Sequence, residues 1–192
     1  MLKNLIIRKL SAWIRPVMLG GYRNHAGEYL KNVRIGSTSC LVQQEKLKLG
    51  DHVYIGHYNF LDASNHLWIA EGCQVTSFVS ILTHSSHIAI RLYGRAYVQV
   101  PADQKIAYQR AGVEIGAYTF IGPHVVIMPG TKIGKGCIVS AFSYVDGEFP
   151  DFSVIAGQPA KVIKDTRQLD APFLEQHPEL KNHYRNWSEQ DI

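Results

Sequence analysis

Aliphatic residues recur at a constant interval of six in the second half of the chain. The positions are Ile115, Ile121, Ile127, Ile133, Val139 and Val145. An α-helix repeats every 3.6 residues and a β-strand every two, so neither returns a side chain to one face at this spacing. A coil with three short strands per turn does, because each side of about six residues then points one aliphatic residue inward. The pattern therefore predicts a parallel β-helix and not the alternating strands of a sandwich.

Two further positions of the repeat agree with a three-sided coil. Glycine follows the aliphatic residue at 116, 122 and 134, where we expect a corner that needs a permissive backbone. The fourth place after the aliphatic residue holds a small side chain, as a crowded inner corner requires. These small residues are Thr119, Val125, Thr131, Cys137 and Ser143.

The same frame extends toward the N-terminus, with turns about two residues longer. If the sides are named A, B and C in turn, the inward residues are Ile35, Leu41, Leu49, Ile55, Leu61, Ile69, Val75 and Ile81. The frame stops on side B after Ile81 and resumes on side C near Val113. Residues 84–112 are therefore predicted to form a long loop at the B/C corner, and loops of this length in a compact domain are usually functional.

The chain of 192 residues is expected to form one domain with capped ends. We assign residues 1–32 to an N-terminal helical cap and lead-in, 33–164 to the coil, and 165–192 to a C-terminal helix or tail. The N-terminal segment is amphipathic and basic up to Pro16. It is too short and too charged to span a bilayer and lacks a cleavage site, so we expect it to cover the first coil. Contact with an anionic membrane surface is the alternative.

Composition excludes some classes of function. The formal charge of +4 is modest and forms no periodic basic stripe, which argues against nucleic acid as a partner. The cysteines are three, at 40, 73 and 137, in or beside the small inward positions. We expect buried, reduced thiols in a cytoplasmic protein, and neither a disulfide framework nor a metal site.

The hexapeptide pattern, the loop that opens on histidines and the closing segment "VIAGQPAKVIK" (154–164) resemble the hexapeptide-repeat acyltransferases, in particular the sugar and polysaccharide O-acetyltransferases. The resemblance implies an all-β fold, the left-handed parallel β-helix, assembled as a homotrimer. It also implies that acetyl-CoA lies between neighbouring subunits and requires no metal. A histidine of the loop would act as general base and transfer the acetyl group directly to a saccharide hydroxyl.

Two histidines compete for the role of base. Alignment with the histidine pair of galactoside acetyltransferases favours His84. The register favours His87, which lies six residues after Ile81, whereas His84 lies only three after it and would still be on the strand. The sequence prediction gives His87 the preference over His84.

Other residues are assigned by the resemblance. Contacts to acetyl-CoA are expected from Phe120, Gly122, Ser140, Ala141, Lys161 and Lys164. Contacts to the acceptor are expected from His57 and Asn59, and from Arg91 and Tyr93 in the loop, whose basic and aromatic side chains suit an acidic saccharide. Asn65 and His66, one coil below, are candidates to orient His87.

Three other functions stay open at this point. The acceptor atom could be the nitrogen of an amino sugar, which would make the chain an N-acetyltransferase. The chain could be a zinc-dependent, carbonic-anhydrase-like protein with His84 and His87 as ligands, although no third histidine is placed with them. It could also be a scaffold without catalysis, an alternative that the histidine-bearing loop disfavours.

Overall fold

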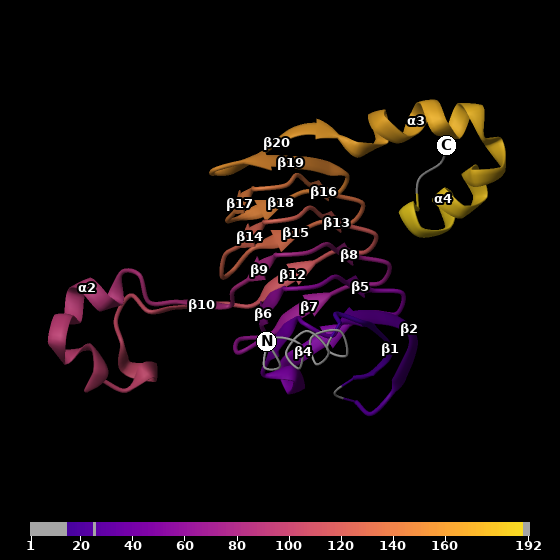
Figure 1. Ribbon diagram of the computed structural model, residues 1–192. Coiled ribbons are helices and arrows are strands. Elements are labelled where there is room, and N and C mark those ends of the chain that lie inside the picture. Colours follow the sequence, from indigo (N-terminus) through magenta and orange to yellow (C-terminus); the bar gives the residue numbers. More distant parts are fainter. Residues whose placement is uncertain (1–14, 25, 190–192) are drawn as a thin grey trace, which may run out of the picture.

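The computed structural model describes residues 15–24 and 26–189. Most of the chain forms three sheets of short strands, stacked as three sides of one coil (Figure 1). The predicted N-terminal helix, and with it the membrane contact, lies outside the described residues.

Each sheet collects one side of the coil. Sheet A contains β1 (Met18–Arg23), β2 (Tyr29–Gly36), β5 (Tyr54–Ile55), β8 (Gln74–Val75), β13 (Phe120–Ile121), β16 (Ile138–Val139), β19 (Ser153–Gly157) and β20 (Ala160–Asp165). Sheet B contains β3 (Cys40–Val42), β6 (Phe60–Asp62), β9 (Ser80–Ile81), β14 (Val126–Ile127) and β17 (Tyr144–Val145). Sheet C contains β4 (Leu47–Leu49), β7 (Leu67–Ile69), β12 (Val113–Ile115), β15 (Lys132–Ile133) and β18 (Glu148–Phe149).

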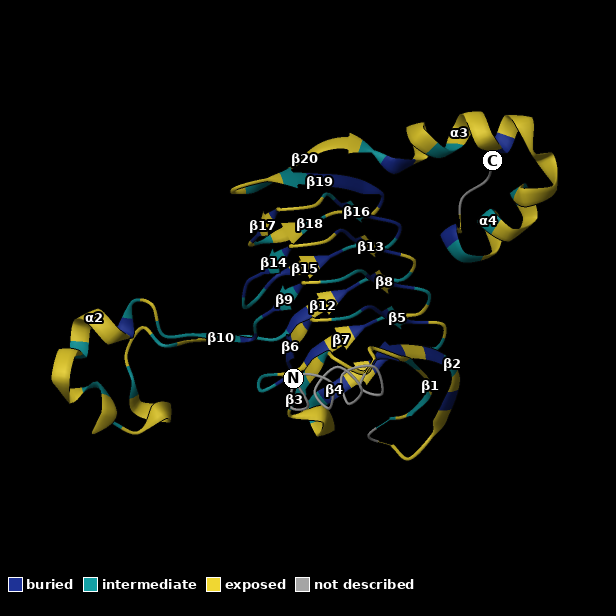
Figure 2. Ribbon diagram, in the orientation of Figure 1, coloured by how far each residue is buried: buried dark blue, intermediate teal, exposed yellow. Residues whose placement is uncertain are grey.

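The register confirms the predicted assignment of the inward residues to three sides. On sheet B, for example, Leu61 pairs with Ile81 and Ile81 pairs with Ile127 in parallel strands. The six aliphatic residues of the C-terminal repeat are at most 3% exposed. They form one continuous core along the coil axis, dark blue where it is visible in Figure 2.

The three glycines of the repeat were predicted to be needed for their permissive backbone, and this reason is wrong. Gly116, Gly122 and Gly134 do not have a positive φ, and they are glycine because the coils approach closely there. A Cβ on Gly122, for example, would lie 2.7 Å from the backbone nitrogen of Ala141 in the next coil. Larger residues take the positive φ at the following corner, among them Phe78 and His124.

The cysteines follow the prediction in part. Cys73 and Cys137 are buried, and burial raises the pKa of their thiols to about 12 and about 11. Cys40 is exposed, so the prediction of a buried thiol is wrong at this position. The reason is the alternation of a strand, since Cys40 precedes the inward residue Leu41 on β3 and points to the other side.

Two segments leave the coil on opposite sides of the molecule (Figure 1). Residues 84–112 form an arm on a ribbon of two antiparallel strands, β10 (His84–Ser85) and β11 (Gln109–Arg110). The arm carries α2 (Ala89–Tyr93), η2 (Gly94–Val98) and η3 (Ala102–Gln104), and the coil resumes with β12 on sheet C.

The C-terminal segment is helical. It contains α3 (Thr166–Gln176), η4 (Pro178–Leu180) and α4 (Lys181–Ser188). Trp187 packs its ring 4.8 Å from that of Tyr118 and so ties this segment to the coil. Within the part of the chain that the structure describes, no helix has the length and apolar character needed to cross a membrane.

Candidate functional site

A buried carboxylate lies where the arm leaves the coil. Asp62 ends β6 on sheet B and its side chain has no solvent exposure. Its Oδ2 accepts hydrogen bonds from the backbone nitrogen and Oγ1 of Thr83, at 3.0 and 2.7 Å. Its Oδ1 accepts from the backbone nitrogen of Ser64 at 2.9 Å and from the hydroxyl of the same residue. Asp62 is thus held from two neighbouring coils.

These donors decide the charge of Asp62. Burial alone would raise the pKa of the carboxyl, because desolvation penalises the charged form. The hydrogen bonds from Ser64 and Thr83 outweigh it and hold the pKa well below its usual range. Asp62 is therefore an ionised carboxylate that can only accept hydrogen bonds.

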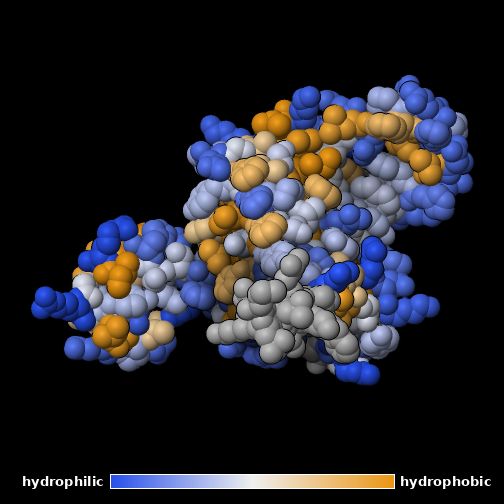
Figure 3. All heavy atoms as spheres, in the orientation of Figure 1, coloured by the Kyte–Doolittle hydropathy of each residue, from blue (hydrophilic) through white to orange (hydrophobic). Residues whose placement is uncertain are grey.

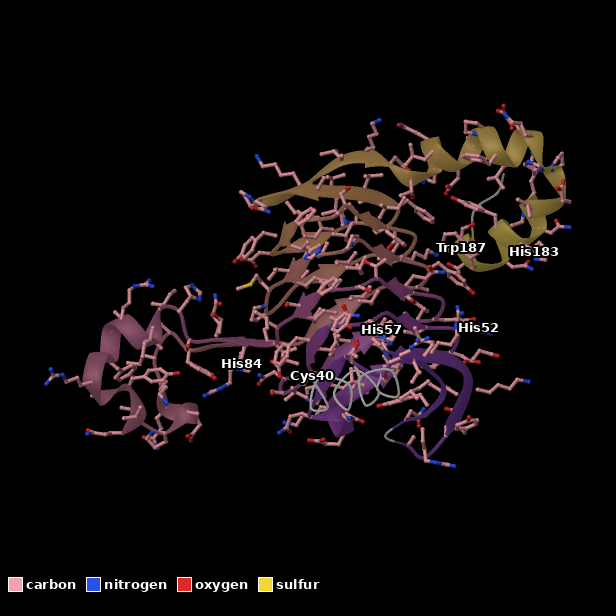
Figure 4. All side chains as sticks on the ribbon, viewed as in Figure 1. Cys40, His52, His57, His84, His183 and Trp187 are labelled. Atoms are coloured by element: carbon pink, nitrogen blue, oxygen red, sulfur yellow. The ribbon has the colours of Figure 1, made fainter. Side chains whose placement is uncertain are left out.

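His84 completes the pair. It is the first residue of β10, and its Nδ1 lies 2.7 Å from Oδ2 of Asp62. Because an ionised carboxylate accepts, Nδ1 carries the proton and the neutral ring has its free lone pair on Nε2. The side chain of His84 is 41% exposed, so the ring is open to solvent. Figure 4 shows His84 at the root of the arm.

Neighbouring side chains support this geometry from the coil and from the arm. The ring of Tyr108 stacks on that of His84 with centroids 6.0 Å apart, and the guanidinium of Arg110 lies 4.6 Å above the Tyr108 ring. Asn65 donates from its side-chain amide to the carbonyl of Thr83 at 3.0 Å. This contact positions Thr83, which is a donor to Asp62, so Asn65 supports the carboxylate and not His87.

His87 has a different environment. It lies exposed on the arm, where its Nδ1 is 2.8 Å from the hydroxyl of Ser85. The reason for preferring it, that His84 still lies on the coil strand, is wrong: β9 ends at Ile81, and His84 already belongs to the ribbon of the arm. Of the two histidines, His84 has the buried carboxylate partner that a general base needs for orientation.

Four of the six residues assigned to acetyl-CoA gather on another part of the coil. Gly122, Ser140 and Ala141 are neighbours at the A/B corner, and Lys161 pairs with Ala156 on the adjoining strand β19 of sheet A. Phe120 points outward from sheet A and lines a hollow of about 500 Å³ beneath α3 and α4. Lys164 is exposed on β20. The strands of sheet B begin at the A/B corner and end at the B/C corner. The A/B corner and His84 therefore lie at opposite ends of these strands.

The residues assigned to the acceptor are not brought together. Asn59 is buried, and its amide donates to the carbonyl of Thr76 at 2.7 Å and accepts from the nitrogen of Val79 at 2.8 Å. His57 lies at the A/B corner, 3.1 Å from the hydroxyl of Thr38.

Two further acceptor candidates lie on the arm and hold it together. Arg91 donates to the carbonyl of His87, and Tyr93 accepts from the nitrogen of Ile106 at 2.9 Å. Both side chains therefore have a structural contact within the arm.

Sequence reasoning missed Asp62, Ser64 and Thr83, and it did not place Tyr108 beside His84. A signal for Asp62 was present, because it directly follows the inward residue Leu61 and precedes Ser64 by two, the spacing of a local side-chain to backbone hydrogen bond. Among the described residues, no group of three or more His, Cys, Asp or Glu side chains is placed to hold a metal ion.

The comparisons with known proteins agree with the repeat. Residues 112–147 match the family model of the bacterial transferase hexapeptide, which has six repeats. A probable acetyltransferase of Mycobacterium tuberculosis is 28% identical over 80% of this chain and 51% of its own length. A putative lipopolysaccharide biosynthesis O-acetyltransferase of Escherichia coli, WbbJ, is 32% identical over 59% of this chain and 58% of its own. The chain thus spans about half the length of these curated relatives.

A solved structure shows the same fold. The galactoside acetyltransferase in complex with coenzyme A is 23% identical, with a TM-score of 0.58 over 69% of this chain and 62% of that one. The four matches and the register of the coil agree with one another. The chain carries the hexapeptide repeat of the bacterial transferases, and the family resemblance predicted from its sequence is confirmed.

Proposed function

We propose that this protein is an acetyl-CoA-dependent O-acetyltransferase that acts on a hydroxyl of a sugar or surface polysaccharide, with His84 as general base. The observation that carries the proposal is the 2.7 Å contact between Nδ1 of His84 and the buried, ionised Asp62. The names of the two relatives support the reaction class, and the E. coli relative supports oxygen as the acceptor atom.

The pair can perform the chemistry of acyl transfer. A sugar hydroxyl is a poor nucleophile at neutral pH, and Nε2 of neutral His84 can accept its proton while the oxygen attacks the thioester carbonyl. The new C–O bond forms, the C–S bond breaks, and the leaving sulfur takes the proton from His84. Asp62 stays ionised throughout, fixes the tautomer and stabilises the imidazolium. Holding both substrates in one cleft supplies much of the rate by proximity.

The positions of the predicted sites favour a cleft between subunits. Four of the residues assigned to acetyl-CoA, Gly122, Ser140, Ala141 and Lys161, lie at the A/B corner, whereas His84 lies at the B/C corner, at the other end of the sheet B strands. A neighbouring copy that presents its A/B corner to His84 would join them. We therefore propose a homotrimer of left-handed coils, in which backbone N–H groups of the coil stabilise the developing oxyanion. Lys161 and Lys164 would meet the phosphates of the donor.

The test is release of coenzyme A from acetyl-CoA in the presence of an acceptor panel. The panel contains galactose, maltose, glucosamine and a sialic acid oligomer, and the thiol of the product is measured with and without EDTA. We expect acceptor-dependent release that EDTA leaves unchanged, with O-acetyl sugar as the product by mass spectrometry. An N-acetylated product would show that the acceptor atom is the nitrogen of an amino sugar and not a hydroxyl oxygen. Bound zinc in the purified protein, without release of coenzyme A, would favour the zinc alternative, and binding of neither substrate would favour a scaffold.

A further inference from the structure

The outer surface of sheet C carries one aromatic side chain in a column of charged ones. Five outward residues are neighbours on successive strands: Lys48, Trp68, Glu114, Lys132 and Glu148. Trp68 is 51% exposed although its strand, β7, has a neighbour on each side. Nothing in the packing of the coil requires an indole there, since the core lies on the other face of the sheet.

Two hollows flank Trp68. The larger, of about 450 Å³, continues along the sheet and is lined by Trp68, Glu114, Lys132 and Glu148, with Phe149 and Pro150 at its end. The smaller, of about 170 Å³, is lined by Trp68 and Glu114 together with Lys46, Lys48, His66 and Gly112. Both hollows are lined by Trp68 and Glu114, so they adjoin at these two side chains. Together they are named the sheet C groove, whose larger part extends over successive strands of the sheet.

The sheet C groove begins at the corner that bears the catalytic pair. Gly112 connects β11 of the arm to β12, and the nitrogen of the next residue, Val113, donates to the carbonyl of His66 at 3.1 Å. His66 follows Asn65, whose amide holds Thr83, and Thr83 donates to Asp62. One end of the groove is therefore joined to the hydrogen-bond network around His84, and the other end points away from it.

We propose that the sheet C groove binds the sugar units that follow the acetylated one, so that the acceptor is an oligosaccharide or polysaccharide chain. An exposed indole offers a flat apolar face with a polar edge, which matches the C–H face of a pyranose ring. Hydroxyl groups around that ring need donors and acceptors on both sides. Lys48 and Glu114 stand directly beside Trp68 to supply them. The inference rests on the proposed function and narrows its acceptor class.

Direct binding tests the groove without any catalysis. The wild-type protein is applied, without acetyl-CoA, to an array of bacterial saccharide fragments of one to six units, beside the variants Trp68→Ala and Tyr29→Ala. Tyr29 is the matched control, because it is an aromatic residue of similar exposure, 59%, on β2 of sheet A. We expect binding that requires three or more units, a loss of about tenfold or more in Trp68→Ala, and no change in Tyr29→Ala. Binding that does not depend on length, or that Trp68→Ala retains, overturns the proposal.

Kinetics separates the groove from the reaction. With an acceptor that the wild type acetylates, Trp68→Ala should raise KM for the oligosaccharide about tenfold and leave both kcat and the KM of the single sugar unchanged. An equal loss for both lengths would place Trp68 outside a chain-binding groove. If no acceptor is acetylated but the array still shows length-dependent binding through Trp68, the groove stands and the proposed activity fails.

Discussion

The coil and the arm bury their aliphatic residues to opposite extents. Ile121, Ile127 and the other repeat residues of the coil have almost no exposure, whereas Leu92 and Ile106 of the arm are 64% and 73% exposed. Figure 3 shows hydrophobic side chains on the surface of the arm. The coil is thus ordered by a repeated core, and the arm by a few polar contacts such as that between Tyr93 and Ile106.

The candidate site combines the two regions. The coil supplies Asp62, fixed by donors from two turns, and the arm supplies His84 and the stacked ring of Tyr108. Precise orientation of a catalytic group requires rigid support, and access for a substrate requires exposure. A rigid carboxylate with a half-exposed imidazole meets both requirements.

The largest expected effect is a charge placed in the coil. Ile127→Asp buries an unpaired carboxylate at a position with no exposure, which should cost about 3–5 kcal/mol or more and prevent stable folding. Circular dichroism and solubility measure the outcome. The control is Tyr144→Asp, which changes an outward residue of the adjoining strand β17 and should fold. A cooperative thermal transition in Ile127→Asp would show that the inward frame is misassigned.

The second effect concerns the carboxylate that joins the regions. The folded pKa of Asp62 is depressed, so its contribution to stability is complete above the unfolded pKa of about 3.9 and is lost as pH falls toward the folded value. Asp62→Asn should reduce the free energy of unfolding by about 1–3 kcal/mol at neutral pH.

The acid limb of the stability curve isolates this contribution. Urea unfolding between about pH 5 and pH 2 should show a steeper loss in the wild type than in Asp62→Asn. Parallel curves for the two proteins would mean that Asp62 is not held ionised by its donors.

Thiol labelling compares the coil interior with its surface. At mildly alkaline pH the folded protein should react rapidly at Cys40, which is exposed, and slowly at Cys73 and Cys137, whose pKa values are raised by burial. Denatured protein should react at all three. We expect Cys40→Ser to lack the rapid phase of labelling. A rapid phase that persists in this variant would place one of the other two thiols at the surface.

The smallest effect is expected in the arm. Leu92→Asp introduces the same group as Ile127→Asp, but at an exposed position, and should change stability by no more than about 0.5 kcal/mol. Thermal unfolding of the two variants under identical conditions makes the comparison. A large loss of stability in Leu92→Asp would show that a surface in the assembled protein covers the arm.

The sequence predicts the coil well and the site only in part, for a physical reason. In a repeat, the spacing identifies the inward residue of every turn. The spacing alone therefore places Ile55, Val75 and Ile121 on one side of the coil, and their strands do pair there. The arm has no repeat, and counting residues from Ile81 misplaced the point where the chain leaves the strand.

Asp62 shows the same limit within the coil. Its partners Ser64 and Thr83 come from its own corner and the next coil, and the hydrogen bonds that ionise it depend on how those corners stack. Spacing along the chain does not carry this information, whereas strand pairing does.

The central claim is that the Asp62-oriented His84, and not His87, is the general base. The most direct measurement is the rate of acetyl transfer by His84→Ala and by His87→Ala, at saturating acetyl-CoA and with the oligomeric state and coenzyme A affinity checked for each. The account predicts that His84→Ala lowers kcat by about a hundredfold or more, the usual scale for a general base, while His87→Ala changes it only a few-fold. A hundredfold loss in His87→Ala with near-normal turnover in His84→Ala would contradict it.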